Sequence, residues 1–212
     1  MSRSSGASTD PLAAFDVSRE TKERLALLER ELRRWQAIKN LVGPATLDRI
    51  WDRHIVDSLQ LLSLAPEART WLDLGSGAGF PGLVIAIAGF ERGLKVDLVE
   101  SNSRKCAFLR HIARLTGVNA TVHEARLETV VPRFVGKADV VSARALASLT
   151  QLLGWTEPLL KAGTMGLFPK GRDAEFELTE ARKSWTFSLE ILPSRTDSEA
   201  RILRITSIES LS

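Results

Sequence analysis

Apolar residues near the start of the chain are spaced by three and four positions, as on one face of an α-helix. The stripe consists of Leu25, Leu28, Leu32, Trp35 and Ile38. The pair Gly43-Pro44 is expected to end this helix, because both residues break helical structure. Residues 1–18 contain no apolar run and are expected to form a flexible tail.

A second helix is expected from about residue 46 to residue 64. At about 100° per residue, its apolar arc consists of Leu47, Trp51, Ile55, Ser58 and Leu62. Arg53 and Asp57 fall on the opposite, polar side, and His54 lies on the shoulder between the two. Asp57 and Ser58 follow His54 by three and four positions, so a local hydrogen-bonded group is expected. This group has two open interpretations, an active-site role and docking of the helix onto a sheet.

From residue 70 onward, short apolar strands alternate with helices. The expected strands cover residues 71–74, 95–99, 120–123, 138–142, 164–168, 185–192 and 201–208, and the expected helices cover residues 80–89, 103–116, 146–160 and 175–184. This alternation predicts a doubly wound α/β sheet with helices on both faces. The last two strands, joined by a short turn, can only be antiparallel to each other. Three regions are expected: a tail (1–18), a helical extension (19–66) and a sheet domain (67–212).

The turn after the first strand is rich in glycine. Gly75, Gly77 and Gly79 stand at i, i+2 and i+4, whereas the dinucleotide fingerprint needs a glycine at i+5, which is Phe80 here. A carboxylate such as Asp73 just before the turn suits a ligand with an ammonium group and would repel a pyrophosphate. A strand, D-x-G-x-G-x-G and a helix are typical of S-adenosylmethionine enzymes. The sequence therefore predicts a Rossmann-like class I methyltransferase fold with this cofactor.

Two further positions are expected to contact the nucleoside part of a ligand. Glu100 ends the next strand, where its carboxylate can accept hydrogen bonds from both ribose hydroxyls. Enzymes that use NAD have the same feature, so Glu100 indicates a nucleoside without identifying it. Leu127 and Glu128 follow the third strand and are candidates for the adenine edge.

The loop after the fourth strand narrows the reaction type. It has neither the Pro-Pro-aromatic motif of enzymes that methylate exocyclic amines nor a cysteine, and Cys106 lies in another helix. Covalent catalysis is therefore not expected, which leaves transfer to an atom that already has a lone pair, such as a ring nitrogen. Arg144 in this loop is a candidate to bind either an RNA phosphate or the cofactor carboxylate.

Charge and composition indicate how the chain would contact a nucleic acid. The net charge is only +3, so RNA binding is expected through local basic patches. The candidates are Arg104, Lys105 and Arg110 on one helix, together with Lys170 at the end of the fifth strand. His111 and His123 lack the spacing of a zinc site, so no metal is expected. One cysteine and no long apolar run predict a cytoplasmic protein that does not insert into a membrane. A monomer is expected.

Three motifs together resemble the RsmG (glucose-inhibited division protein B) family. They are W-x-R-H-I-x-D-S-L at residues 51–59, W-L-D-L-G-S-G-A-G-F-P-G at 71–82 and L-V-E-S-N-x-R-K-x-x-F-L at 98–109. The resemblance extends over about residues 24–206. Gln36 and Pro169 depart from the family pattern.

The resemblance implies methylation of N7 of one guanosine in the decoding region of 16S ribosomal RNA, with free RNA or the assembling small subunit as partner. It also implies cofactor contacts at Gly75, Phe80, Leu127, Glu128 and Arg144. Since N7 carries a lone pair and no proton, Arg53, His54, Asp57 and Ser58 are expected to position groups, and no general base is expected. A small-molecule methyltransferase and a non-catalytic RNA- or protein-binding module remain as alternatives.

Overall fold

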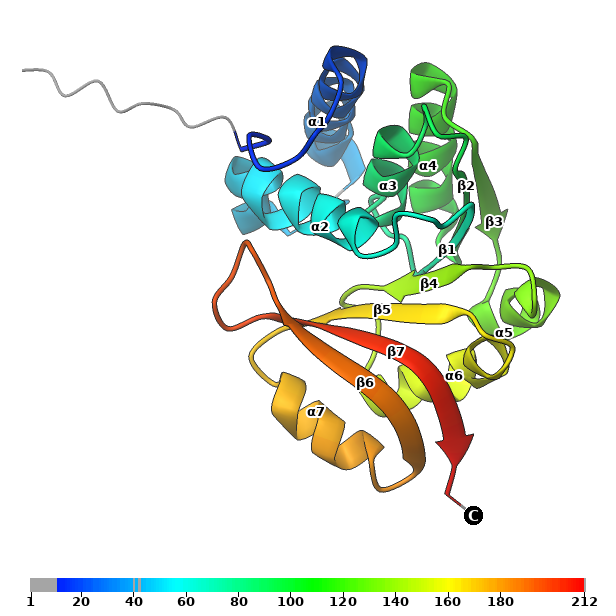
Figure 1. Ribbon diagram of the computed structural model, residues 1–212. Coiled ribbons are helices and arrows are strands. Elements are labelled where there is room, and N and C mark those ends of the chain that lie inside the picture. The colour runs from blue at the N-terminus through cyan, green and yellow to red at the C-terminus, as the bar shows by residue number, and fades with distance from the viewer. Residues whose placement is uncertain (1–10, 40, 42, 212) are drawn as a thin grey trace, which may run out of the picture.

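The computed structural model describes residues 11–39, 41 and 43–211 and contains a seven-stranded sheet with helices on both faces (Figure 1). The strand order is β3-β2-β1-β4-β5-β7-β6. The strands are β1 (Thr70–Leu74), β2 (Lys95–Glu100), β3 (Ala120–Glu124), β4 (Val140–Ala143), β5 (Met165–Lys170), β6 (Trp185–Pro193) and β7 (Arg201–Ser210). The predicted doubly wound sheet is confirmed.

The first five strands are parallel, and β7 is antiparallel to both of its neighbours. β7 lies between β5 and β6, so the last hairpin extends the sheet and β6 runs in the same direction as β5. The loop between β6 and β7 therefore lies at the sheet edge where the parallel strands end. Ligands bind at this edge in open α/β sheets.

Helices α1 (Arg19–Lys39), α2 (Asp57–Ser63), α3 (Gly82–Ala88) and α4 (Ser103–Thr116) share one hydrophobic core, whose members include Leu25, Leu28 and Leu32. Trp35 and Trp51 pack against this core, as their apolar spacing predicts. On the opposite face, α5 (Leu127–Val130), the 3₁₀ segment Val131–Phe134, α6 (Leu149–Lys161) and α7 (Ala174–Ala181) cover a second core. No helix in the described part of the chain is long and apolar enough to span a membrane.

Packing against the core begins before residue 18, which is earlier in the chain than expected. Residues 1–10 of the expected tail lie outside the described residues. Leu12, however, is buried, and Phe15 and Val17 pack against the α1–α4 core, so the tail does not extend to residue 18. The boundary at residue 66 and the monomeric state stay predictions.

The second helix is not the continuous α-helix that was expected. A 3₁₀ segment (Pro44–Arg49) is followed by a π-helical segment (Trp51–Val56), and α2 begins only at Asp57. A π-helix has five-residue hydrogen-bond spacing, so the side chains fall at different angles than in an α-helix. Arg53, His54 and Asp57 all line the same cleft.

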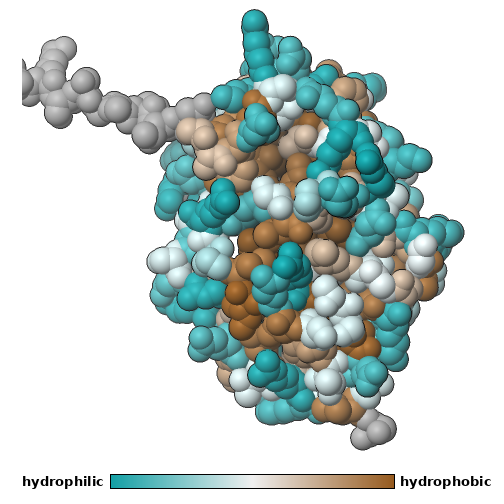
Figure 2. Space-filling model, in the orientation of Figure 1, coloured by the Kyte–Doolittle hydropathy of each residue, from teal (hydrophilic) through white to brown (hydrophobic). Residues whose placement is uncertain are grey.

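On the face seen in Figure 2, apolar side chains gather near the centre, in the region of β5–β7, with hydrophilic side chains around them. No helix lies in front of this part of the sheet in Figure 1.

Candidate active site

Two adjoining cavities lie at the ends of the parallel strands. The larger measures about 500 Å³ and the smaller about 300 Å³. Gly75, Lys105 and Ala145 line both cavities, so the two adjoin each other at the glycine turn. Arg53, His54, Asp57, Gly77, Phe80, Arg144 and Lys170 line the larger cavity, and Glu100, Leu127 and Glu128 line the smaller one.

Two glycines of this turn, Gly75 and Gly77, occupy positions that favour a residue without a side chain. A Cβ on Gly75 would lie 2.5 Å from a methyl carbon of Leu146, so a side chain there would clash. A Cβ on Gly77 would have only the carbonyl oxygen of Gly75 within 4 Å, at 3.8 Å, and would extend into open space beside the larger cavity. Both glycines have positive φ. Gly79 is buried and packs against Leu83, so it does not have the ligand contact that was expected.

Asp73 is fully buried, which corrects its expected contact with a ligand ammonium group. Its Oδ1 accepts a hydrogen bond from Ser142 at 2.7 Å, and its Oδ2 accepts one from the backbone N–H of Gly82 at 3.2 Å. Ser142 in turn accepts from Trp71 Nε1 at 2.9 Å. Burial raises the pKa of Asp73 to about 6 against these hydrogen bonds, which favour the charged form. Asp73 therefore joins β1, β4 and the start of α3 beneath the cleft.

Glu100 lies at the smaller cavity, as its position at the end of β2 predicts. Its Oε2 accepts from the backbone N–H of Gly77 at 3.0 Å, and its Oε1 accepts from that of Asn102 at 2.8 Å. Each carboxylate oxygen has a further lone pair, so hydrogen bonds from ligand hydroxyls remain possible. Leu127 and Glu128 line the same cavity, where an adenine contact was expected.

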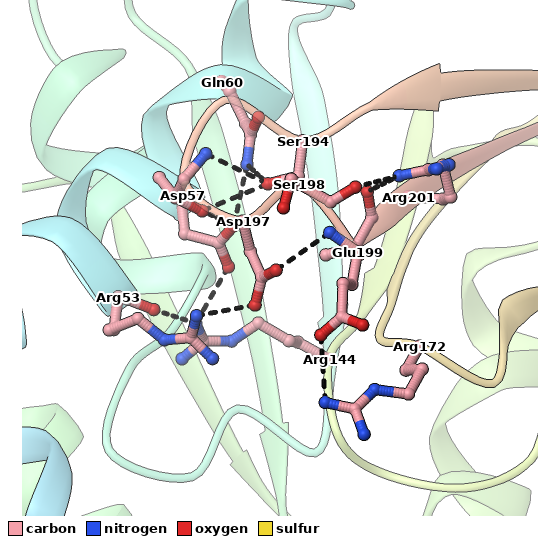
Figure 3. Close-up of polar contacts among 12 residues, drawn as sticks. Arg53, Asp57, Gln60, Arg144, Arg172, Ser194, Asp197, Ser198, Glu199 and Arg201 are labelled. Carbon is pink, nitrogen blue, oxygen red and sulfur yellow. Dashed lines mark hydrogen bonds and ion pairs between the residues drawn. The ribbon is translucent and has the colours of Figure 1, made fainter.

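Arg144 follows β4, and its guanidinium is held by three residues, His54 and the two seen in Figure 3, Arg53 and Asp57. Nη1 donates to the carbonyl oxygen of Arg53 at 3.0 Å and to Oδ2 of Asp57 at 3.1 Å. Nη2 donates to Nδ1 of His54 at 2.8 Å, and the guanidinium carbon lies 5.5 Å from the centre of the Phe80 ring. The planar guanidinium thereby orders groups from the N-terminal segment at the entrance of the cleft.

His54 is a neutral hydrogen-bond acceptor at this site. Because arginine can only donate, Nδ1 must accept, and the ring proton lies on Nε2. Burial first, and then the charges of Arg144 and Arg53, lower the pKa of His54 to about 4. The ring stacks on Phe80 at 4.7 Å between ring centres, and Nε2 is buried with no partner among the described residues. His54 has no free lone pair with which to accept a proton.

The expected local group of His54, Asp57 and Ser58 is corrected in part. Ser58 is fully buried, and its hydroxyl donates to the carbonyl oxygen of His54 at 2.6 Å, so it stabilises the helix and does not reach the cleft. The His54 ring interacts with Arg144 from another segment. Arg53 lines the cleft and donates to Asp197 at 2.7 Å. The proposed positioning roles of Arg53, His54 and Asp57 stay predictions.

The predicted RNA-binding residues occupy different environments. Arg104 is exposed on α4, and Lys105 lines both cavities. Arg110 pairs with Glu124 at 2.8 Å on the surface. These three contacts with RNA stay predictions.

Lys170 differs from the expected free phosphate ligand. Its side chain is only 7% exposed, and its Nζ donates to Glu177 at 2.7 Å and to the carbonyl oxygen of Ala147 at 2.8 Å. A phosphate would have to compete with these internal partners.

Two features of the cleft were not predicted from the sequence. Ala145, which lines both cavities, has a φ of 51°, a strained conformation for a residue with a side chain. The β6–β7 loop contributes Ser194, Thr196 and Asp197 to the larger cavity. Residues 193–199 were expected only to form a turn, and no local pattern indicates that this turn reaches the site.

The chain has the Rossmann-like fold that methyltransferases of known structure share. Similar solved structures include an O-methyltransferase from Bacillus cereus, with a TM-score of 0.58 and 13% identity over 92% of this chain and 95% of that chain. A SAM-dependent methyltransferase from Aquifex aeolicus has a TM-score of 0.57 and 15% identity over 80% and 96% of the two chains. At these identities the likeness concerns the fold alone.

Sequence comparison then identifies the family. The family model described as rRNA small subunit methyltransferase G matches residues 21–202. Ribosomal RNA small subunit methyltransferase G of Methylobacterium radiotolerans is 67% identical over 197 residues, which cover 93% of each chain. That of Methylorubrum populi is 63% identical over 198 residues, again 93% of each chain. The chain belongs to the rRNA small subunit methyltransferase G family, as the motifs predict.

Among the described residues, no group of three or more His, Cys, Asp and Glu side chains could hold a metal ion. The expected absence of a metal stays a prediction.

Proposed function

We propose that this chain transfers the methyl group of S-adenosylmethionine to N7 of a guanosine in 16S ribosomal RNA. The observation that carries the proposal is the pair of adjoining cavities at the glycine turn, in a chain of this family. The smaller cavity offers the carboxylate of Glu100 for a ribose, and the larger offers Arg144 beside an open cleft. One elongated nucleoside ligand can span both cavities.

The residues of the turn fit such a cofactor. The space at Gly77 would be filled by a Cβ, and positive φ at Gly75 and Gly77 lets the backbone follow the ligand closely. Leu127 and Glu128 would meet the adenine. When bound, the cofactor supplies an electrophilic methyl group on a sulfonium.

The chain's own residues would position the reactants and would not remove a proton. Guanine N7 has an in-plane lone pair and no proton, so the N–CH₃ bond forms as the S–CH₃ bond breaks and the electron pair remains on sulfur. His54 fits this scheme, because its Nδ1 lone pair is engaged by Arg144 and its pKa is about 4. The carboxylate of Asp57 is also engaged, because it forms an ion pair with the guanidinium of Arg144. Alignment of the two reacting atoms is then the main contribution to rate.

The substrate must present N7 outside a regular helix, because the major groove of A-form RNA is too deep and narrow for side chains. Lys105 lies at the wall of the larger cavity, and the exposed Arg104 precedes it on α4. These two cations would provide phosphate contacts, because Arg53 and Arg144 are already paired within the protein.

The test measures 7-methylguanosine by nucleoside mass analysis after incubation of the protein with S-adenosylmethionine and rRNA from cells that lack it. Free 16S rRNA and purified small subunits are separate arms, which identifies the form of the substrate. We expect one new 7-methylguanosine in one of the arms. Methylation of neither, with normal cofactor binding by calorimetry, would refute the rRNA function and favour a small-molecule substrate.

A further inference from the structure

The β6–β7 loop is joined to the N-terminal helical segment across the cleft, as Figure 3 shows. Arg53 Nη1 donates to Asp197 Oδ2 at 2.7 Å, and Thr196 Oγ1 donates to Asp57 Oδ1 at 3.0 Å. Gln60 reinforces the junction by accepting from the backbone N–H of Arg195 at 2.9 Å. The loop thus bonds directly to two residues that line the larger cavity.

Asp57 connects the loop to Arg144. Its Oδ1 accepts from Thr196 and also from Gln60 Nε2 at 2.7 Å, while its Oδ2 accepts from Arg144 Nη1 at 3.1 Å. Both oxygens are therefore engaged, one by the loop side and one by the guanidinium. The side chains of Asp57 and Arg144 are only 16% and 17% exposed, so water competes weakly for these bonds.

Asp197 holds Arg53 in a similar way but closer to solvent. Its Oδ1 accepts from the backbone N–H of Glu199 at 3.0 Å, which orders the loop, and its Oδ2 is left to receive Arg53. Arg53 also supplies the carbonyl oxygen that accepts from Arg144. A change at Asp197 therefore acts on Arg53 and, through its backbone, on Arg144.

We infer that Thr196 and Asp197 are positioning residues of the methyltransferase site, acting through Asp57 and Arg53 to set the orientation of Arg144. The inference rests on the proposed function for its reaction but on the loop contacts for its residues. Neither residue is expected to touch the rRNA phosphates, because a carboxylate repels them and the Thr196 hydroxyl is used by Asp57. Their loss should lower kcat and leave the KM for rRNA unchanged.

The test compares four variants. Thr196→Val removes the hydroxyl at constant volume and is expected to lower kcat about tenfold, the effect of one hydrogen bond to a charged group. Thr196→Ser keeps the hydroxyl and should restore kcat. Asp197→Asn keeps the acceptor for Glu199 but loses the charge, and we expect a fall of about threefold because this pair is partly exposed. Glu199→Gln is the matched control, since its partner Arg172 lies on the surface.

Three measurements decide the outcome: steady-state kcat and KM on the form of rRNA that the wild-type protein methylates, Tm, and NMR signals of the Arg53 and Arg144 side-chain N–H groups. Lower kcat at constant KM and Tm, with broadened arginine signals, supports the inference. A raised KM, a fall in Tm that accounts for the lost activity, or unchanged kcat overturns it.

The two proposals fail separately. If the wild-type protein does not methylate rRNA, the proposed function fails, and the arginine N–H signals still report whether Thr196 and Asp197 order Arg53 and Arg144. Unchanged signals in Thr196→Val and Asp197→Asn would then overturn the positioning role as well.

Discussion

Replacing Arg144 by lysine separates the charge of this residue from its shape. The guanidinium reaches Nδ1 of His54 through Nη2 while Nη1 serves Asp57 and the Arg53 carbonyl. A lysine ammonium is a single point donor and cannot occupy both places. We therefore expect Arg144→Lys to keep the charge of the cleft. It should lose either the hydrogen bond to His54 or the hydrogen bonds to Asp57 and the Arg53 carbonyl.

The magnitude follows from the bonds that are lost. A hydrogen bond to a charged group contributes about 1.5–3 kcal/mol. If these bonds are made in full only in the aligned complex, losing one lowers kcat/KM by about 10- to 150-fold. Arg144→Gln loses the charge as well as the fork and should lower kcat/KM at least as much.

The pKa of His54 provides a second, independent measurement. Burial is the largest cause of its low value, and the charge of Arg144 is the next. In Arg144→Gln the pKa should rise above about 4 but stay below 6.5, whereas in Arg144→Lys it should stay near the wild-type value. The sign for stability follows: a depressed histidine pKa stabilises the folded protein above about pH 6.5, and this contribution is lost as the pH falls toward 4.

The assay is single-turnover formation of 7-methylguanosine with the three proteins, alongside NMR titration of histidine. A kcat/KM of Arg144→Lys equal to that of the wild type would refute the role of the planar guanidinium. An unchanged His54 titration in Arg144→Gln would refute the electrostatic contribution.

Three further predictions concern the cofactor, Asp73 and Lys170. Gly77→Val should abolish S-adenosylmethionine binding in calorimetry, whereas Gly136→Val, with the same positive φ but away from both cavities, should keep it. The raised pKa of Asp73 means that the folded state holds the proton more tightly, so Asp73 by itself lowers the free energy of unfolding as the pH rises from about 4 to about 6. His54 acts in the opposite direction over this range, so the test is the difference in the free energy of unfolding between wild type and Asp73→Asn in urea titrations, which should fall from about pH 4 to about pH 6. Lys170→Met should lower the free energy of unfolding by about 1–3 kcal/mol, because Glu177 loses its cation. The salt dependence of rRNA binding should not change in Lys170→Met, and a smaller slope would show that Lys170 meets a phosphate.

Local pattern was sufficient for the strands, for most of the helices and for the place of Glu100 at the end of β2. The alternation of apolar strands and helices predicts the parallel sheet, because each strand and its helix form a unit with its own periodicity. Glu100 ends β2 and so lies at the edge where the glycine turn after β1 also lies, a consequence of parallel strands alone. These positions follow from neighbours in the sequence.

Burial, in contrast, depends on what packs above a residue. The carboxylate of Asp73 has the same local sequence whether it faces a ligand or the sheet, but Ser142 on β4 and the start of α3 enclose it. Lys170 ends β5 as expected, and α7 then brings Glu177 to its ammonium. A one-dimensional pattern contains no information on these covering groups.

The tertiary structure also determines how the N-terminal helical segment and the β6–β7 loop come into contact. Asp57 and Thr196 are 139 positions apart, and their hydrogen bond exists because β7 is inserted between β5 and β6. This insertion makes β6 run with β5 and turns the β6–β7 loop toward the cleft. The π-helical segment 51–56 presents Arg53 and His54 to the cleft together with Asp57. The sequence determined the residues and most of the elements, but the strand order determined which of them face one another, because it depends on packing summed over the whole sheet.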